Sequence, residues 1–341
     1  MYLQSISHAV PPHAFSQKEA WAILQHSGAL NKLSERSAAL LEKVLLGDSG
    51  IEQRYFATEN PTQLFTLDAE TLNQNFEHNA PRLARDALTK ALAEAHLNAH
   101  ELDALFICTC TGYICPGLTS HVAELLNLDP QTYLQDIVGL GCGAAIPTLR
   151  SAQGFLAANP NATVACIAVE VCSAAFYLDN DPGVLISACL FGDAASASIW
   201  SNNDTRTGYR IQKFDTYHAP KHREALRFTN SAGKLRNQLH RSVPEIAAPI
   251  VHNLFNQSEQ SPDTPIISHT GGRDVLDALE TVLPTPLTPS RNTLKAYGNV
   301  SSPSVLITLE TILQDTDLAR HYWLTAFGAG FAAHSCELVN G

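Results

Sequence analysis

The stretch DIVGLGCGAA, residues 136–145, contains one cysteine inside a glycine-dense turn. The run from Tyr133 to Val138 before it favours a strand, and the run from Ala144 to Ala158 after it is compatible with a helix. A cysteine at such a turn lies beside the unpaired N–H groups and the positive dipole end of the helix, which favours its thiolate form. The flanking glycines leave room for a substrate carbonyl beside the backbone. The pattern predicts that Cys142 is a nucleophile.

Composition bounds the kind of protein to expect. The chain has 341 residues, is 45% hydrophobic and carries a formal net charge of −11, which predicts a large core and argues against a general nucleic-acid binder. The first residues, MYLQSISHAVPPHAF, lack the basic and apolar regions of a signal peptide, and no apolar run reaches membrane-spanning length. We therefore expect a cytoplasmic protein with neither nucleic acid nor membrane as a partner.

The eight cysteines do not indicate a disulfide framework in an intracellular chain of this size. The spacing of Cys108, Cys110 and Cys115 is reminiscent of a metal site, but no second cluster of cysteine or histidine completes it. Cys108 and Cys110 alternate along a predicted strand, so both are expected to face one side as small apolar residues. We expect no bound metal.

Predicted strands alternate with predicted helices, which indicates an α/β architecture. The sequence Asn79-Ala80-Pro81 predicts the start of a strongly amphipathic helix. The predicted strands after it are Asp103–Cys110, Tyr133–Val138, Thr163–Val171, Ala194–Trp200, Tyr209–Phe214, Pro265–His269, Tyr322–Phe327 and Phe331–Leu338.

Two segments echo each other across the chain. ALFICTCTG (residues 104–112) and PIISHTGG (residues 265–272) are both apolar strands that end in a polar turn and lead to a helix. The echo suggests an internal duplication with a site where the halves meet. We predict one half at residues 1–201, carrying the cysteine, and another at residues 202–341.

The second half supplies two further polar loop residues. His269 in SHTGG could stabilise a thiolate as a cation or donor, and Asn299 in GNVSS presents an amide that cannot titrate and suits an oxyanion. Each pattern alone is weak, since a single histidine is usually a structural residue and Gly-Asn is usually a turn.

Two other enzyme classes fit parts of this pattern. GLGCGA imitates a dinucleotide-binding turn, and Glu170 closes a strand 31 residues beyond Gly139, as in an NAD-dependent Rossmann dehydrogenase. However, a strand–helix unit precedes this turn, and the cysteine would crowd a pyrophosphate. The order Cys142, His269, Asn299 is also that of a papain-like hydrolase, but no signature of that family surrounds the cysteine.

With these motifs in view, the chain resembles the thiolase-fold condensing enzymes, and most closely the type III polyketide synthases of the chalcone and stilbene synthase family. The similarity covers nearly the whole chain through SGIEQRY, CTCTGYICPG, GLGCGAA, VEVCSAAF, LFGDAASA, SHTGG, YGNVSSPSVL and AFGAGF. GNVSS and SHTGG favour this branch over the fatty-acid-type ketosynthase III.

The resemblance implies a thiolase-like αβαβα layered fold with two pseudo-symmetric halves, and a homodimer. It implies that Cys142 carries the acyl group while His269 and Asn299 drive decarboxylation of malonyl-CoA. The enolate would attack the acyl group, and the product would be an alkylpyrone or a resorcinol-type polyketide. An alternative is a thiolase-fold ketosynthase that joins chains bound to acyl carrier protein. An inactive scaffold is disfavoured because all three polar residues are present.

The resemblance also implies a set of substrate-binding residues. Asn237 falls at a gatekeeper position where plant members carry phenylalanine, and Cys115 falls where plant members contribute a methionine across the dimer. The full set is Phe176, which matches the first aromatic gatekeeper, Cys115, Asn237, the cavity-lining Ser301, Gly271 and Gly272.

Substrate delivery is predicted to use the basic stretch from Lys221 to Arg241, expected as a surface loop. Arg223, Arg227 and Arg236 would hold CoA phosphates or an acidic carrier protein. A run of charge is often only a solvated face, so this assignment depends on location. No cofactor is expected beyond acyl-CoA and malonyl-CoA as substrates.

Overall fold

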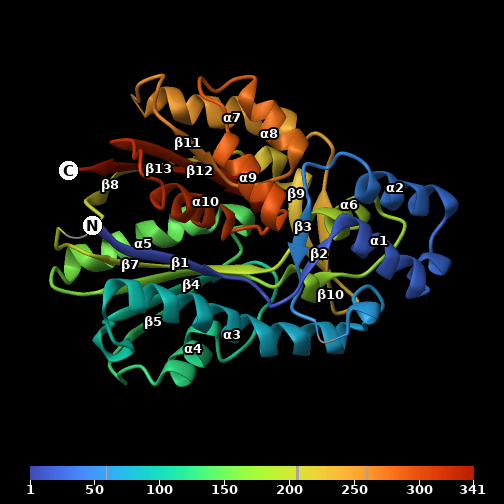
Figure 1. Cartoon of the computed structure of the whole chain (residues 1–341), viewed down its shortest axis with the longest axis horizontal. Helices are drawn as coiled ribbons and strands as arrows, with labels where there is room; N and C mark the ends of the chain where they lie inside the picture. The colour runs from blue at the N-terminus through green and yellow to red at the C-terminus, as the bar shows by residue number, and fades with distance from the viewer. Residues whose placement is uncertain (59, 205–206, 259) are drawn as a thin grey trace.

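The computed structural model describes residues 1–58, 60–204, 207–258 and 260–341. Its described strands form one nine-stranded mixed sheet and two two-stranded sheets, one of which pairs β2 (Ala14–Ser16) with β3 (Gln53–Tyr55). The large sheet contains its strands in the order β11-β12-β13-β8-β1-β7-β6-β4-β5 (Figure 1). Their bounds are β1 Tyr2–Ala9, β4 Ala104–Thr109, β5 Tyr133–Val138, β6 Val164–Glu170, β7 Ala194–Ser201, β8 Tyr209–His218, β11 Ile266–Ser268, β12 His321–Gly328 and β13 Ala332–Asn340.

Strand pairing repeats in the two parts of this sheet. β1 pairs antiparallel with β7, β7 antiparallel with β6, and β6 parallel with β4. In the same sequence of relations, β8 pairs antiparallel with β13, β13 antiparallel with β12, and β12 parallel with β11. The two parts join where Tyr2 of β1 pairs with Arg210 of β8. This repetition is the internal duplication that the two echoing segments predicted, while the division after residue 201 stays a prediction.

Helices complete a layered arrangement (Figure 1). α3 and α4 cover the outer face of the first part, α7 and α8 cover that of the second, and α5 and α10 lie between the two. The helix bounds are α1 Gln17–His26, α2 Glu35–Leu46, α3 Ala69–Ala95, α4 Leu118–Leu126, α5 Ala145–Ala158, α6 Pro182–Leu190, α7 Val243–Gln257, α8 Arg273–Glu280, α9 Thr288–Tyr297 and α10 Ser304–Leu313.

The predicted start of the long helix at Asn79 to Pro81 is wrong. α3 begins ten residues earlier, after Asp68, whose carboxylate accepts the backbone N–H of Thr71, and Pro81 lies inside it. The buried face continues upstream of the proline through Leu72 and Phe76. Because Asp68 caps the helix and this face is buried, helix continues on both sides of the proline despite its missing N–H.

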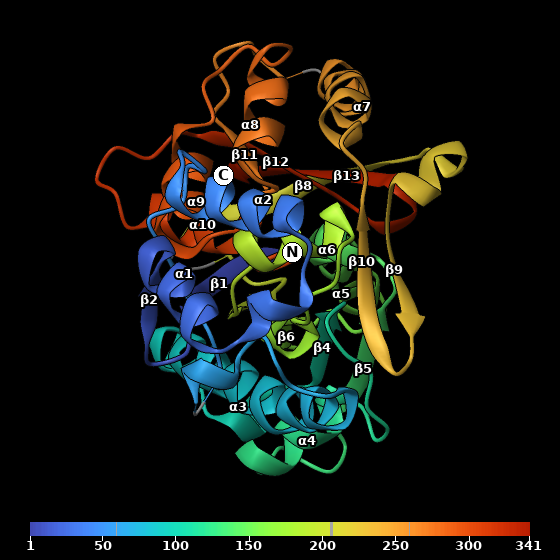
Figure 2. The same ribbon diagram turned by 90° about the vertical axis from the view of Figure 1, so that its right-hand side faces the viewer.

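The basic stretch from residue 221 to residue 241 is a hairpin and not the predicted loop. A short 3-10 helix, Pro220–Ala225, leads into β9 (Leu226–Ser231) and β10 (Lys234–Leu239), which pair antiparallel. The turn residues Ala232 and Gly233 both have positive φ, at 50° and 75°. Such a two-residue turn matches the twist of the strands. Figure 2 shows this ribbon beside α6, whose Ser187 accepts a hydrogen bond from Asn237 of β10.

In the part of the chain that the structure describes, no helix combines the length and the hydropathy needed to cross a membrane.

Candidate active site

The three predicted catalytic residues come from three separate elements. Cys142 lies in the turn Gly141–Gly143 between β5 and α5, and His269 directly follows β11. Asn299 lies between α9 and α10. α5 leads into β6 and α10 leads into β12, and these two strands occupy equivalent places in the repeated pairing. The predicted nucleophile, Cys142, and the Asn299 amide therefore precede equivalent helices of the two halves.

Cys142 and His269 both border the segment Phe327 to Gly328 at the end of β12. The His269 ring meets the Phe327 ring edge to face, with centroids 4.4 Å apart. A Cβ atom on Gly328 would lie 2.9 Å from the backbone nitrogen of Cys142 and 2.6 Å from that of Gly143. Only glycine allows this close packing, which fixes the nucleophile turn against the strand beside the imidazole.

Asn299 is oriented by three hydrogen bonds. Its backbone N–H donates to the Leu190 carbonyl at 2.9 Å, and its carbonyl accepts the Gly192 N–H at 3.1 Å. Its side-chain oxygen accepts the Ser301 N–H at 2.9 Å. Because this oxygen is occupied by a donor, the side-chain NH₂ is the group left to contact a substrate oxygen.

Ser301 joins Asn299 to the nucleophile. Its hydroxyl lies 3.2 Å from the Cys142 sulfur, 3.4 Å from the Cys110 sulfur and 3.3 Å from a Glu170 oxygen. Its φ is +57°, a left-handed conformation that is uncommon for serine and typical of functional sites. The position that the resemblance assigned to the cavity wall thus lies in contact with the Cys142 sulfur.

Glu170 is a site residue that the sequence analysis considered only within the disfavoured dehydrogenase alternative. It is fully buried at the end of β6, and its carboxylate accepts the Ser302 hydroxyl at 2.6 Å and the Cys110 N–H at 2.9 Å. The Thr109 and Thr111 hydroxyls also donate to it. Burial raises the pKa of this carboxyl. A ribose-binding acid would need to face an open crevice, so the dehydrogenase interpretation of Glu170 is wrong. The sequence did contain a sign of its buried position, because this carboxylate ends an otherwise apolar strand.

Cys110 also differs from its prediction. Cys108 is buried in β4 as expected, but β4 ends at Thr109, and Cys110 lies beyond it with its sulfur beside the Ser301 hydroxyl. The strand alternation that would have turned both cysteines to one side no longer applies there. Cys110 is therefore a polar member of the site and not part of the apolar core.

The electrostatics of the resting site differ from the sequence expectation. Burial raises the pKa of the Cys142 thiol to about 11, although the Ser301 hydroxyl acts in the opposite direction. Burial also lowers the pKa of His269 to about 4. Near neutral pH these groups are a thiol and a neutral imidazole, so neither the thiolate expected at the helix end nor a cationic His269 is favoured. Desolvation is the largest cause of both pKa shifts.

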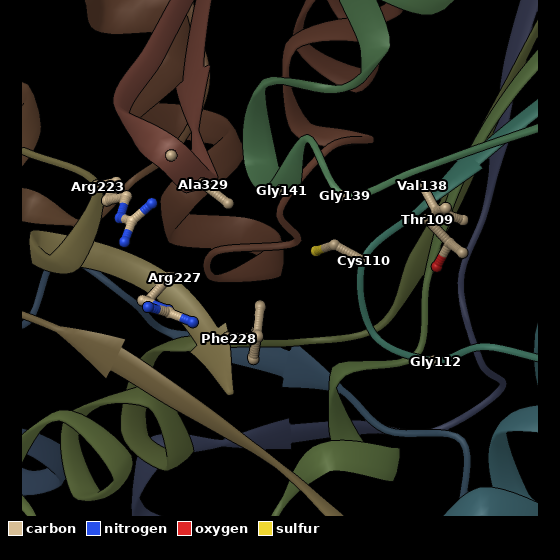
Figure 3. Close-up of a pocket in the computed structure, with 11 residues that line it drawn as sticks. Thr109, Cys110, Gly112, Val138, Gly139, Gly141, Arg223, Arg227, Phe228 and Ala329 are labelled. Atoms are coloured by element: carbon tan, nitrogen blue, oxygen red, sulfur yellow. The ribbon is translucent and has the colours of Figure 1, made fainter. Parts of the chain in front are cut away.

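An open cleft of about 420 Å³ reaches the site at Cys110 and Gly141, whereas in the part of the chain that the structure describes Cys142, His269 and Asn299 do not line it. Cys110 and the backbone of Gly139 and Gly141 line one side, while Arg223, Arg227 and Phe228 line the other (Figure 3).

Both cleft arginines form ion pairs with Glu224, at 2.9 Å for Arg223 and 2.8 Å for Arg227. Arg236 instead pairs with Asp181 at 2.7 Å and does not line this cleft. Of the three arginines predicted to dock substrate, two lie at the cleft.

The aromatic gatekeeper position is filled by tight packing. Phe176 is buried, stacks on Phe65 with centroids 5.7 Å apart, and meets the edge of Phe56 at 5.6 Å. Cys142 packs against the same apolar cluster. Asn237 is buried on β10 and donates to the Ser187 hydroxyl at 2.9 Å.

The remaining predicted substrate residues lie in loops. Cys115 is exposed between β4 and α4, and within the described chain it does not line the cleft. Gly271 lies under the imidazole, since a Cβ there would come within 3.0 Å of His269 Nε2. Gly272 precedes α8 with a φ of 122°. Among the described residues, no three histidine, cysteine or acidic side chains are grouped to hold a metal ion.

Comparisons with known proteins agree with the geometry. The family described as FAE1/Type III polyketide synthase-like protein matches residues 7–255. The 1,3,6,8-tetrahydroxynaphthalene synthase of Streptomyces griseus is 27% identical over 336 residues, covering 95% of this chain and 89% of that protein. The 3,5-dihydroxyphenylacetyl-CoA synthase of Amycolatopsis orientalis is 30% identical over 246 residues, covering 69% and 66%.

A solved structure extends the likeness to the whole fold. The 1,3,6,8-tetrahydroxynaphthalene synthase of Streptomyces coelicolor A3(2), a bacterial type III polyketide synthase, matches with a TM-score of 0.87 at 26% identity over 99% of both chains. This agreement confirms the thiolase-like fold predicted from the motifs. It also overturns the dehydrogenase and papain-like alternatives. The chain therefore belongs to the FAE1/type III polyketide synthase-like family of acyltransferases, which condense acyl units into polyketides.

Proposed function

We propose that Cys142 carries the growing chain while His269 and Asn299 act on malonyl-CoA, so that acyl groups are extended by decarboxylative Claisen condensation. The observation that carries the proposal is the orientation of Asn299. Its amide oxygen is bonded to Ser301, whose hydroxyl contacts the Cys142 sulfur. A fixed N–H donor beside a nucleophilic sulfur suits a thioester enolate, in which negative charge develops on oxygen.

In the loading step, the Cys142 thiol passes its proton to a nitrogen of His269 as the sulfur attacks the thioester carbonyl. The carbon–sulfur bond to CoA then breaks, and the CoA thiolate recovers that proton. The route starts from neutral forms: His269, with a pKa of about 4, is unprotonated at neutral pH. Because it is a weak base and the Cys142 thiol has a pKa of about 11, the proton moves only as the carbon–sulfur bond forms and not before. The nucleophile is thus generated only as substrate arrives.

In the extension step, the bond between the malonyl methylene and its carboxylate breaks, CO₂ leaves, and the electron pair forms a thioester enolate. The Asn299 NH₂ and a ring N–H of His269 donate to the enolate oxygen. Nδ1 of His269 is buried without a hydrogen-bond partner among the described residues, so no fixed contact imposes one tautomer. Nε2 can therefore accept a proton during loading and donate one during extension.

The enolate carbon attacks the acyl–Cys142 carbonyl, releases the thiolate and leaves a β-ketoacyl chain on CoA. Return of this chain to Cys142 allows another extension. The named products of the two relatives above carry hydroxyl groups in 1,3 relation on aromatic rings. Alternating carbonyls of a poly-β-keto chain generate that pattern, which favours a resorcinol-type product over an alkylpyrone for this chain.

Coenzyme A thioesters are the proposed substrates, held by Arg223 and Arg227 at the cleft. Only a short path separates this cleft from the nucleophile, because Cys110 lines it and contacts Ser301. A carrier protein would need a wider basic surface, and Arg236 is already paired with Asp181. No further cofactor enters the proposed reaction, and a reducing cytoplasm would suit its free cysteines.

A homodimer is proposed from the exposed edge of the sheet. In the described chain β5 pairs with β4 on one side, while its Tyr133, Leu134 and Val138 are 48%, 37% and 54% exposed. An apolar strand edge of this kind is a template for pairing with another chain. In such a dimer, the exposed Cys115 could reach the partner's cavity. Leu134→Lys should convert the dimer to monomer in light scattering.

The decisive experiment is incubation of the purified protein with malonyl-CoA, alone and with a panel of acyl-CoA starters. Mass spectrometry should detect an acyl adduct on the peptide containing Cys142 and products that grow by the mass of one ketene unit per cycle. Acyl carrier protein thioesters serve as the comparison. Release of a single condensation product from carrier protein only would favour the ketosynthase alternative.

A further inference from the structure

Arg54 on β3 (Gln53–Tyr55) is a fully buried cation to which the mechanism above gives no role. Its Nη1 donates to the carbonyls of Ala188 and Phe191, both at 2.8 Å, and its Nε donates to the side-chain oxygen of Gln17 at 2.9 Å. Its guanidinium carbon also lies 4.9 Å from the centre of the Phe56 ring. Burial of an arginine is costly, so a structure that keeps one needs its hydrogen bonds.

These bonds are concentrated at the end of α6. The last carbonyls of a helix have no partner within the helix. Here Arg54 takes those of Ala188 and Phe191, the Gln17 side chain takes that of Cys189 at 3.0 Å, and the Asn299 backbone N–H takes that of Leu190 at 2.9 Å. The end of α6 is thus a platform held from beneath by Arg54 and Gln17. Asn299 is attached to the same platform.

Arg54 packs closely against the segment that carries Asn299. Gly298 lies directly on the arginine stem, since a Cβ there would come within 2.7 Å of Arg54 Cγ and 2.8 Å of the Leu190 carbonyl oxygen. Asn299 also forms a parallel β-bridge with Phe191. A shift of the Leu190–Gly192 segment would therefore move the Asn299 amide.

We propose that Arg54 is a positioning residue for decarboxylation, because it holds the end of α6 as the support that aims the Asn299 amide at the enolate oxygen. This inference rests on the proposed role of Asn299. Arg54 has no contact with the Cys142 sulfur, so loading should be much less sensitive to its removal. A donor displaced by about 1 Å can cost on the order of 10²-fold in rate.

The test compares Arg54→Met, Asn299→Ala and the double variant. Cys142 acylation is followed by intact-protein mass spectrometry, and decarboxylation by release of labelled CO₂ from malonyl-CoA. Arg54→Met should lower decarboxylation by about 10²-fold while loading changes by less than about threefold. The double variant should decarboxylate no more slowly than Asn299→Ala, because Arg54 acts through Asn299.

A purely structural role gives a different pattern. It would lower the melting temperature, and the losses in the double variant would multiply. Tyr209→Phe serves as the control: it removes a buried hydrogen bond from Tyr209 to the Ala319 carbonyl, outside the platform, and should lower stability without changing decarboxylation per folded enzyme.

Gln17→Leu provides a second variant if Arg54→Met does not fold. It keeps the arginine but removes the acceptor of its Nε–H and the donor to the Cys189 carbonyl. We therefore expect a smaller loss of decarboxylation than in Arg54→Met. In the Asn299→Ala background, Gln17→Leu should cause no further loss. Normal decarboxylation in a folded Arg54→Met, or multiplying losses, overturns this inference alone. Normal decarboxylation in Asn299→Ala overturns the proposed role of Asn299 and this inference with it.

Discussion

The two halves use equivalent positions for different chemistry. The turn before α5 carries the Cys142 thiol, whereas the turn before α10 carries the Asn299 amide. Likewise β4 and β11 pair in parallel with equivalent strands, yet Cys110 follows the first and His269 the second. Duplication thus brought two helix starts and two strand ends to one place.

The surroundings of the polar residues in the two halves differ in charge. In the first half, Cys110 lies beside the carboxylate of Glu170, which accepts its backbone N–H. In the second half, His269 lies against the Phe327 ring and is kept neutral by burial, with its pKa near 4. In the proposed mechanism the first half would therefore supply the nucleophile, and the second would supply neutral groups that can donate to an anion. The division assigns covalent chemistry to one half and enolate stabilisation to the other.

The largest effect is expected from Cys142→Ala, which removes the proposed nucleophile of the first half. Without the sulfur no acyl enzyme forms, so chain extension should be abolished. Decarboxylation of malonyl-CoA should persist, because it requires the donors and not the nucleophile. Acetyl-CoA formation and product formation can be followed together by chromatography with mass detection. Loss of both activities in a folded variant would show that the halves are not separable in this way.

Substitutions of the two proposed donors in the second half, His269 and Asn299, should have different effects. His269→Ala should slow both loading and decarboxylation, because the imidazole accepts the thiol proton and holds the enolate. Asn299→Ala should slow decarboxylation by about 10²–10³-fold, as expected for one oxyanion donor, and leave loading intact. Rapid-quench mass spectrometry of Cys142 acylation makes the comparison. Equal loss of loading in both variants would contradict the division.

The pH profile tests whether the pair is neutral. With a Cys142 pKa of about 11 and a His269 pKa of about 4, loading should vary by about twofold or less between pH 5 and 9. A thiolate–imidazolium pair would instead give a limb between pH 6 and 8.

Acid stability provides the control for this profile. The unfolded chain binds a proton at His269 near its ordinary pKa of 6.5, while the folded chain resists binding until about 4. This histidine therefore lowers stability as the pH falls through that window, so folding should be checked by circular dichroism at each acidic point.

Much of this site was predictable because its signals are local. A strand, a glycine turn and a helix start are encoded within about twenty residues around Cys142. Glu170 could not be placed in the same way, since its Ser301 and Ser302 partners lie 131 and 132 residues away in sequence. The ionisation states of Cys142 and His269 could not be predicted either, because they depend on burial by residues distant in sequence, such as Phe327.

Secondary structure failed where tertiary packing decided. A proline usually marks a helix start, but Pro81 lies within α3 because the buried face extends upstream to Leu72. The β9–β10 hairpin was missed because most of its residues are basic or polar, and the apolar alternation that marks a half-buried strand is confined to Leu226 and Phe228.

A glycine pair offers a gentler perturbation of the same division. Gly271→Ala would bring a methyl group within 3.0 Å of His269 Nε2, so loading and decarboxylation should both fall by about tenfold. Gly154→Ala is the matched control in α5, where nothing lies within 4 Å of the new methyl group. It should leave activity unchanged and raise stability by about 0.5–1 kcal/mol, measured by thermal melting. Similar activity losses in both variants would remove the assigned role of Gly271.

The smallest effect is expected at the cleft, where the CoA part of the substrate is proposed to bind. Exchanging Arg223 and Arg227 for glutamine should raise KM for acyl-CoA by about threefold to tenfold and leave kcat nearly unchanged, because exposed ion contacts are weak and persist equally in ground and transition states. The wild-type KM should rise with salt more than that of the variant.

Three comparisons decide whether phosphate recognition causes this effect. Arg236→Gln is the matched control, because Arg236 pairs with Asp181 away from the cleft and should leave KM unchanged. A short pantetheine thioester lacks the nucleotide phosphates, so its KM should not respond to loss of the cleft arginines. Glu224→Gln should lower KM for acyl-CoA, since Glu224 pairs with both cleft arginines and its negative charge competes with phosphate. Equal responses of acyl-CoA and pantetheine would mean that the arginines shape the cleft without binding the phosphates.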